Sequence, residues 1–138
     1  MKKITLLTPL LFLLIASCRD SREGLVPFVP VNITINVNEP TFFNLTVPTG
    51  WVYITGGSRG IIVYRKSQTE FVAIERHSTF EPQNNCAVSV ESSNLILKDP
   101  CSDSKWLISD GSIVNGPASR PLLQYEVVFQ DPFLYVNN

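Results

Sequence analysis

The sequence predicts an all-β fold, an antiparallel β-sandwich or small barrel of short strands. Two observations lead to this prediction. Short runs of apolar, β-branched and aromatic residues recur along the chain, and turns rich in Gly, Pro and Asn separate them. In addition, no stretch of ten or more residues shows the sustained 3.6-residue periodicity of a helix with one buried face. Short strands with frequent turns are typical of sandwiches and small barrels.

Five strands are expected in the first half of the chain. Val31–Val37 alternates apolar and polar residues with a period of two, which indicates a strand with one buried face. Phe42–Val47 and Trp51–Thr55 are rich in β-branched and aromatic residues, so each is expected to form a strand. Ile61–Tyr64 is apolar throughout and predicts a fully buried strand, and Glu70–Glu75 predicts the next.

The Gly56–Gly60 segment predicts a tight connection between two of these strands. Glycine-rich loops also bind phosphate, but they usually do so at the N-terminus of a helix. No helical pattern follows Gly60, so a hairpin turn is the better interpretation.

The amino terminus has the pattern of an export signal that ends in a lipidated cysteine. Two lysines open the chain, and Ile4–Ile15 is an apolar run too short to span a bilayer of roughly 30 Å. The segment Leu14–Cys18 (L-I-A-S-C) resembles the lipobox of bacterial lipoproteins. This resemblance implies a signal peptide at residues 1–17 and acyl chains on Cys18 that anchor the domain to a membrane. The alternative is an ordinary secretory signal followed by a chance cysteine.

The residues after Cys18 predict a location and a linker. Arg19 stands where an aspartate would signal retention in the inner membrane, which favours the outer membrane of a bacterial cell envelope. Pro27 and Pro30 favour an extended tether over residues 18–30. Its last twelve residues could reach about 40 Å. One β domain is then expected over residues 31–138, a size that supports a real core.

The charge of the chain argues against nucleic acid as a partner. Beyond residue 17 there are nine Lys and Arg against twelve Asp and Glu, a net charge of about −3, with no basic block. Phosphate backbones are bound by clustered cations, which this sequence lacks.

Three cysteines occur, and lipidation of Cys18 would leave Cys86 and Cys101 as a pair. The cell envelope is oxidising, so a disulfide is the expected state. It would close a loop of about 15 residues and contribute roughly 3 kcal/mol in the chain-entropy model. Two free buried thiols or a metal site are the alternatives.

Several segments of the second half resemble the Rieske iron–sulfur domain. Ala73–His77 (A-I-E-R-H) ends a predicted strand, and Asp99–Trp106 reads D-P-C-S-D-S-K-W. Asp110–Leu122 then supplies D-G-S-I-V-N-G-P-A-S-R-P-L before Tyr125–Val127. The Rieske family has C-x-H in one loop, C-P-C-H-G-S-x-F in a second, and D-x-x-G…G-P-A-x-x-P-L leading into the last strand. The resemblance covers roughly residues 50–128.

The resemblance also implies where a [2Fe–2S] cluster would be bound, and there the sequence departs from the family. A Rieske cluster needs two cysteine thiolates on one iron and two histidines on the other. Glu75 replaces the first cysteine and His77 matches its histidine, while Asp99 replaces the second cysteine and Ser102 the second histidine. Three of four ligands are missing, and His77 is the only histidine in the chain. No cluster is therefore expected.

Cys101 matches the second-loop cysteine of the disulfide that ties the two cluster loops together in many Rieske proteins. In those proteins its partner lies soon after the first-loop histidine, a place that Phe80 takes here. Cys86 comes six residues later, behind what looks like an inserted turn at Glu81–Asn85. The resemblance thus implies a Cys86–Cys101 bridge with a displaced partner.

Three functional hypotheses follow. The first is a non-enzymatic envelope lipoprotein whose cluster-less domain binds a partner protein at a loop tip formed by Phe80–Asn85 and Asp103–Lys105. The second is electron transfer as a [2Fe–2S] subunit of an oxidoreductase, which the family alone would imply. The third is a mononuclear metal or small-ligand site at the vacated position.

The third hypothesis has a specific donor set and a simpler alternative. His77, Glu75, Asp99 and Asp103 offer nitrogen and oxygen donors on two adjacent loops, which suit a divalent metal. The simpler interpretation is a hydrogen-bonded histidine that holds the loops in place.

Overall fold

The computed structural model describes residues 24–138. The expected signal peptide and Cys18 therefore lie outside the described residues. No helix within residues 24–138 is long and apolar enough to cross a membrane. In chain order the elements are β1 (Asn32–Asn36), η1 (Pro40–Thr46), β2 (Trp51–Ile54), β3 (Ile61–Arg65), β4 (Phe71–Glu75), η2 (Pro82–Asn84), β5 (Ser89–Val90), β6 (Ile96–Lys98), β7 (Lys105–Leu107), β8 (Ile113–Asn115), β9 (Gln124–Gln130) and β10 (Phe133–Asn137), where η marks a 3-10 helix.

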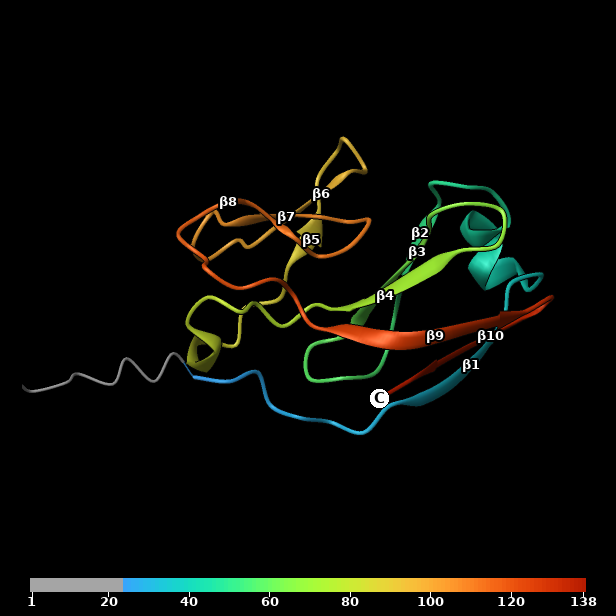
Figure 1. Cartoon of the computed structure of the whole chain (residues 1–138), viewed down its shortest axis with the longest axis horizontal. Coiled ribbons are helices and arrows are strands. Elements are labelled where there is room, and N and C mark those ends of the chain that lie inside the picture. The colour runs from blue at the N-terminus through green and yellow to red at the C-terminus, as the bar shows by residue number, and fades with distance from the viewer. Residues whose placement is uncertain (1–23) are drawn as a thin grey trace, which may run out of the picture.

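The strands form two antiparallel sheets (Figure 1). The larger is curled and six-stranded, in the order β1-β10-β9-β4-β3-β2, and the smaller is four-stranded, in the order β5-β6-β7-β8. The all-β class predicted from the sequence is therefore confirmed. The smaller sheet lies entirely between β4 and β9 in the sequence, so it is an insertion into the larger one.

β3 is buried on both faces, which explains its uninterrupted apolar sequence. Ile61 and Val63 face a core inside the curled sheet, together with residues of β1 and β10. Ile62 and Tyr64 face a second core, which the four-stranded sheet closes with Leu97 and other side chains. Because successive residues of a strand point to opposite faces, a strand between two cores is apolar at each position that faces one of them, here Ile61–Tyr64.

β1 has the predicted alternation and one buried face. Val31, Ile35 and Val37 are buried, whereas Asn32 and Thr34 are exposed. The strand pairs with β10, so it forms one edge of the six-stranded sheet. Period-two patterning thus located this strand and its inward face correctly.

The strand predicted at Phe42–Val47 is wrong, because this segment belongs to the 3-10 helix η1. Pro40 stands in the first turn, and the Phe42 amide donates to the Glu39 carbonyl at 2.9 Å. Only Leu45 is buried, and Phe43 is 71% exposed. β-branched and aromatic content and the apolar–polar alternation of Phe43–Val47 misled the prediction, which overlooked that Pro40 suits the first turn of a helix.

The Rieske-like run into Tyr125–Val127 does not lead into the last strand. β9 covers these residues, and β10 follows and pairs with both β9 and β1. β10 is central to one half of the larger sheet, and its Leu134 and Val136 are fully buried.

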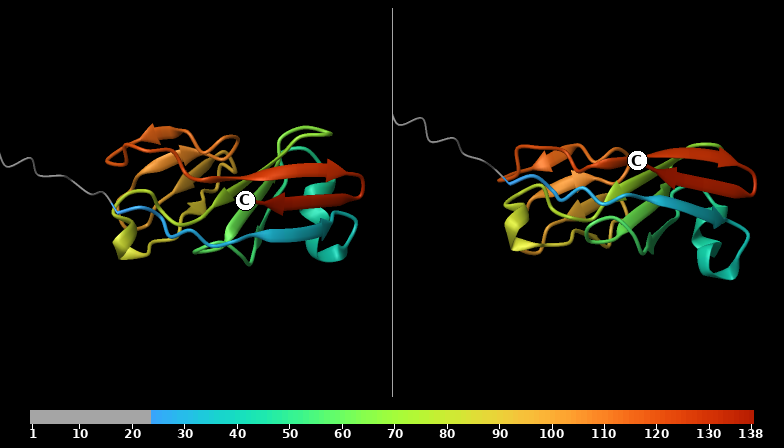
Figure 2. Two further views of the ribbon diagram at one scale, coloured as in Figure 1. Left: turned by 60° about the horizontal axis from the view of Figure 1, so that its bottom comes forward. Right: turned by 90° about the horizontal axis from the view of Figure 1, so that it is seen from below.

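Residues 24–30 have no regular secondary structure but lie along the domain (Figure 2). The Asn138 side-chain amide donates to the Val29 carbonyl at 3.0 Å. At the other end of the segment, the Arg120 guanidinium donates to the Gly24 carbonyl at 3.2 Å. Both ends of this part of the expected tether are thus hydrogen-bonded to the domain.

Arg65, at the end of β3, is buried and stabilises the η1 end of the fold. Its guanidinium donates to the carbonyls of Leu45, Ser67 and Gln68. Replacing it with lysine, Arg65→Lys, is expected to lower the free energy of unfolding by about 1.5 kcal/mol, because an ammonium cannot reproduce the planar fork. Chemical denaturation measures this loss. The exposed Arg59 gives a matched control, and an equal loss in Arg59→Lys would contradict the explanation.

Candidate functional site

The four positions at which the Rieske resemblance places cluster ligands lie on two loops joined by a disulfide. Glu75 ends β4 and His77 follows it, whereas Asp99 and Ser102 lie between β6 and β7. Cys86 and Cys101 form a disulfide with a Cα–Cα distance of 6.3 Å. The predicted pairing is confirmed, and the alternatives of free thiols or a metal held by these thiols do not apply to this state of the chain.

Glu75 is 1% exposed, and its carboxylate is surrounded by hydrogen-bond donors. Oε1 accepts from the backbone amides of Arg59, at 3.0 Å, and His77, at 2.8 Å. Oε2 accepts from the Ser58 amide at 2.7 Å and from the Tyr125 hydroxyl at 2.6 Å. A buried carboxylate is costly unless it is hydrogen-bonded, and here four donors meet that requirement.

The Gly56–Gly60 loop supplies two of these donors because Gly57 lets it approach the carboxylate. Gly57 has φ of +61°, and a Cβ there would lie 2.2 Å from Glu75 Oε2. Only glycine fits both this backbone conformation and this contact. The sequence correctly predicted a turn at this place, but nothing in it connected the turn with Glu75.

His77 is fully buried, and both ring nitrogens have partners. Nε2 lies 2.7 Å from the Pro82 carbonyl oxygen, and Nδ1 lies 2.8 Å from Ser58 Oγ. A carbonyl oxygen can only accept, so Nε2 carries a hydrogen and donates it. In a neutral ring, Nδ1 then accepts the Ser58 hydroxyl hydrogen. His77 thus ties β4 to η2 and to the Gly56–Gly60 loop.

Asp99 is also fully buried and joins the two loops. Its Oδ1 accepts from the Cys101 amide at 2.9 Å. Its Oδ2 accepts from the hydroxyls of Ser78, at 2.8 Å, and Ser102, at 2.7 Å. Because Ser78 is on the first loop and Ser102 on the second, this carboxylate connects the loops as the neighbouring disulfide does.

The side chains at these four positions do not fit a [2Fe–2S] cluster. Such a cluster needs two thiolates and two imidazole nitrogens. The chain offers one histidine, and Cys86 and Cys101 are bonded to each other. Moreover, the carboxylates of Glu75 and Asp99 accept seven hydrogen bonds between them from this chain's own donors.

The donor set proposed for a single metal is not brought together. Asp103 is 78% exposed and points away to Lys98, with an Nζ–Oδ1 distance of 2.7 Å. This ion pair lowers the pKa of Asp103 and raises that of Lys98, chiefly through the hydrogen bond between them. Within residues 24–138, the only group of three or more His, Cys, Asp or Glu residues whose ligand atoms all lie within 4.8 Å of one another is Cys86, Asp99 and Cys101, and its two sulfurs form the disulfide.

The predicted loop tip is exposed only in part. Glu81, Gln83–Asn85 and Asp103 are exposed, and they offer polar side chains to solvent. Phe80 packs against the second core, and Pro82 and Ser104 are buried. The apolar members of the predicted tip, Phe80 and Pro82, therefore pack within the domain.

Ser58, Ser78 and Tyr125 donate to these carboxylates or to His77, and sequence reasoning singled out none of them. Ser58 lies 17 positions from Glu75, and Tyr125 lies 50 positions from it. Tyr125 lies on β9, which pairs directly with β4. The only signal for Ser58 was its place after two glycines, which permit a close approach of the backbone.

Removing the Tyr125 hydroxyl, Tyr125→Phe, is expected to lower the free energy of unfolding by about 1.5 kcal/mol, because Glu75 loses one donor. Burial, and then the hydrogen bond to Glu75, raise the pKa of Tyr125 above its usual value. The folded chain therefore keeps this proton at a pH where the unfolded chain loses it, and this stabilisation is fully present below about pH 10 and declines above it.

The difference in stability between the native chain and Tyr125→Phe should consequently shrink as the pH rises above 10. Denaturant unfolding at a series of pH values measures this difference. Tyr135→Phe, on the neighbouring strand β10, provides a tyrosine control. A gap that stays constant or grows above pH 10 would contradict the assignment.

Comparisons with known proteins support the fold. No family model and no curated protein matches the sequence. Among solved structures, the chain is similar to the ferredoxin of carbazole 1,9a-dioxygenase from Nocardioides aromaticivorans IC177, with a TM-score of 0.50 and 15% sequence identity. The match covers 78% of this chain and 95% of the ferredoxin. At this identity the similarity concerns the fold alone, and the chain has a Rieske-like β fold.

Proposed function

We propose that this chain is a cell-envelope lipoprotein whose Rieske-like domain carries no [2Fe–2S] cluster and acts as a non-enzymatic binding or structural module. The observation that supports it most is the hydrogen bonding of Glu75, His77, Asp99 and Ser102. In this structure the polar atoms of these side chains are bound to one another or to neighbouring donors and acceptors. A buried network whose groups are paired rigidifies a site, and every carboxylate oxygen of Glu75 and Asp99 already accepts from a donor of the chain itself.

The proposed anchor is a lipid on Cys18, in the outer membrane of a bacterium. Its support comes from the L-I-A-S-C segment and from Arg19 after the cysteine. The proposed partner surface consists of the exposed residues Glu81, Gln83–Asn85 and Asp103. These side chains are polar. They therefore suit a hydrated, reversible contact better than an obligate interface, which is usually more apolar.

A second candidate function is electron transfer, favoured by the similarity in fold to a ferredoxin. One experiment distinguishes the two. The full chain is expressed in cells with active cluster assembly and purified from membranes. We expect a colourless protein with no stoichiometric iron or acid-labile sulfide. A visible chromophore with two irons per chain would reject the cluster-less domain and support electron transfer.

Lipidation is tested separately by growing the cells with a clickable fatty acid. The native chain is expected to incorporate the label, and Cys18→Ser is expected to lose it and to leave the membrane fraction. Labelling of both proteins alike, or of neither, would reject the anchor. Separation of inner and outer membranes then tests the proposed location.

A photo-crosslinking amino acid at Gln83 tests the proposed partner surface. Gln83 is exposed, so the substitution should not disturb the fold. Thr34, exposed on β1, is the control site on a different part of the domain. A defined crosslinked protein from position 83 and none from position 34 is the expected result.

A further inference from the structure

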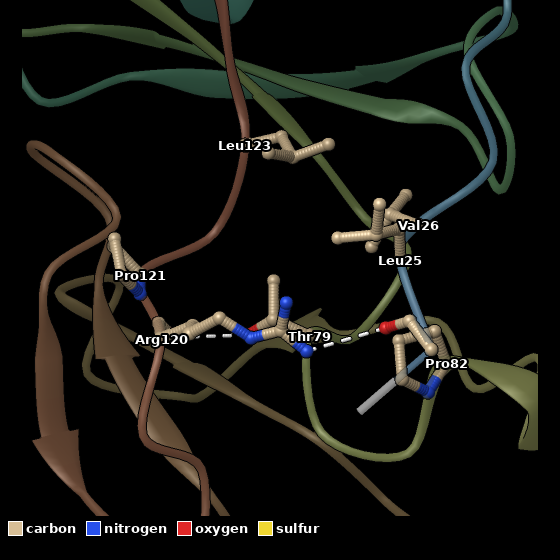
Figure 3. Close-up of a pocket in the computed structure, with 8 residues that line it drawn as sticks. Leu25, Val26, Thr79, Pro82, Arg120, Pro121 and Leu123 are labelled. Carbon is tan, nitrogen blue, oxygen red and sulfur yellow. Dashed lines mark hydrogen bonds between the residues drawn. The ribbon is translucent and has the colours of Figure 1, made fainter. Parts of the chain in front are cut away.

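An apolar cavity of about 320 Å³ lies where the described chain begins (Figure 3). Leu25 and Val26 form one side of it, and Pro121 and Leu123 form the other. Leu25 is 80% exposed and Leu123 is 48% exposed. Exposed apolar side chains that lie next to one another indicate a contact surface, whereas single exposed ones are common on any protein.

Hydrogen bonds fix the start of the described chain beside this cavity. Arg120 lies at the cavity and donates to the Gly24 carbonyl at 3.2 Å. Gly24 also lies against η2, since a Cβ on it would be 3.3 Å from Gln83 Oε1. The chain therefore enters the domain at the cavity, and residue 23 is covalently attached at that point.

The proposed lipid on Cys18 is only six residues before Gly24. Even a fully extended chain spans only about 20 Å over this separation. An acylated Cys18 lies at the membrane surface, so the cavity and its apolar rim would be held within that distance of the headgroups. The chain between Cys18 and Gly24 can thus span only about half of the distance expected for a tether over residues 19–30.

We propose that the face formed by Leu25, Val26, Pro121 and Leu123 contacts the surface of the bilayer in which Cys18 is anchored. This inference rests on the proposed lipidation. Apolar side chains at such a surface enter the boundary between headgroups and acyl chains.

The contact also gives the domain an orientation. Residues 24–30 begin at the end of the molecule that carries η2, and η1 lies at the opposite end (Figures 1 and 2). The loop with η2 thus faces the membrane, and η1 points away from it. A protein that binds the polar tip at Glu81 and Gln83–Asn85 would then itself lie at the membrane surface.

The test uses tryptophan as a reporter in the full, acylated chain. Leu25→Trp and Leu123→Trp place it in the proposed contact, and Phe43→Trp places it on η1, where Phe43 is 71% exposed. Each protein is reconstituted into vesicles of phosphatidylcholine and phosphatidylglycerol, with or without bromine on the acyl chains. Bromine quenches a tryptophan that enters the bilayer, and the emission of the native chain is subtracted as background.

We expect several-fold stronger quenching for Leu25→Trp and Leu123→Trp than for Phe43→Trp. Unfolding curves establish that each variant is folded, and either contact variant alone decides the result. Mass spectrometry establishes the acyl chains on Cys18. If the chain is acylated but all three variants are quenched alike, the contact is rejected and the anchor stands.

If Cys18 carries no lipid, the proposed function and this inference fall together. A tryptophan at position 25 whose emission depends on protein concentration, and not on bromine, would indicate a second copy of the chain on this face. That result would also reject the membrane contact.

Discussion

Replacing Glu75 with glutamine is expected to lower the free energy of unfolding by about 3 kcal/mol. The carboxylate accepts four hydrogen bonds, two on each oxygen. The glutamine side chain keeps one accepting oxygen. Its NH2 group takes the place of the other carboxylate oxygen and faces the groups that donated to that oxygen. In either orientation at least one backbone amide then remains buried without an acceptor. Denaturant unfolding of Glu75→Gln and the native chain measures the loss.

Glu126→Gln serves as the matched control, because Glu126 is an exposed residue of β9. Surface substitutions of this kind usually change stability by less than about 0.5 kcal/mol. Equal midpoints for the native chain and Glu75→Gln would show that the donors around Glu75 contribute no net stability, and would remove the main support for the cluster-less proposal.

Removing the Cys86–Cys101 disulfide is expected to cost about 3 kcal/mol, since it closes a loop with a sequence separation of 15. The double variant Cys86→Ser, Cys101→Ser should therefore unfold at a clearly lower concentration of guanidinium than the native chain. Native protein treated with dithiothreitol is the matched control and should approach the variant.

The position of the disulfide adds a second expected result. Cys101 donates its amide to Asp99, and Ser78 and Cys86 belong to the segment that carries the other loop. Without the bridge, the backbone amide hydrogens around Asp99 should exchange with solvent faster than those of β3, whose residues are buried. Equal exchange in both regions, or an unchanged midpoint, would contradict a structural role for the bridge.

Together these interactions connect the two loops through the chain's own side chains and amides. Glu75 binds the Gly56–Gly60 loop to β4, and Asp99 links Ser78 to Ser102. Each carboxylate acts as an acceptor for donors that would otherwise be buried without partners. The geometry explains why acidic residues at these positions are compatible with a folded core.

Local pattern reasoning succeeded where an element is long enough to show its period. β1 and β3 were located with their buried faces because alternation or continuous apolar sequence identifies them. It failed at η1, where aromatic content resembled a strand, and it gave no signal for β5, which is two residues long. Two or three residues cannot display a period, so tertiary pairing alone defines such strands.

The sequence by itself determined the all-β class and a donor inventory with one histidine, and it predicted the Cys86–Cys101 pairing that the structure shows. These follow from residue types and their order. Only the tertiary structure decided that Glu75 meets donors 16, 17 and 50 positions away, and that Leu25 and Leu123 share one cavity. Such contacts depend on strand pairing and loop closure between distant segments, which no local pattern specifies.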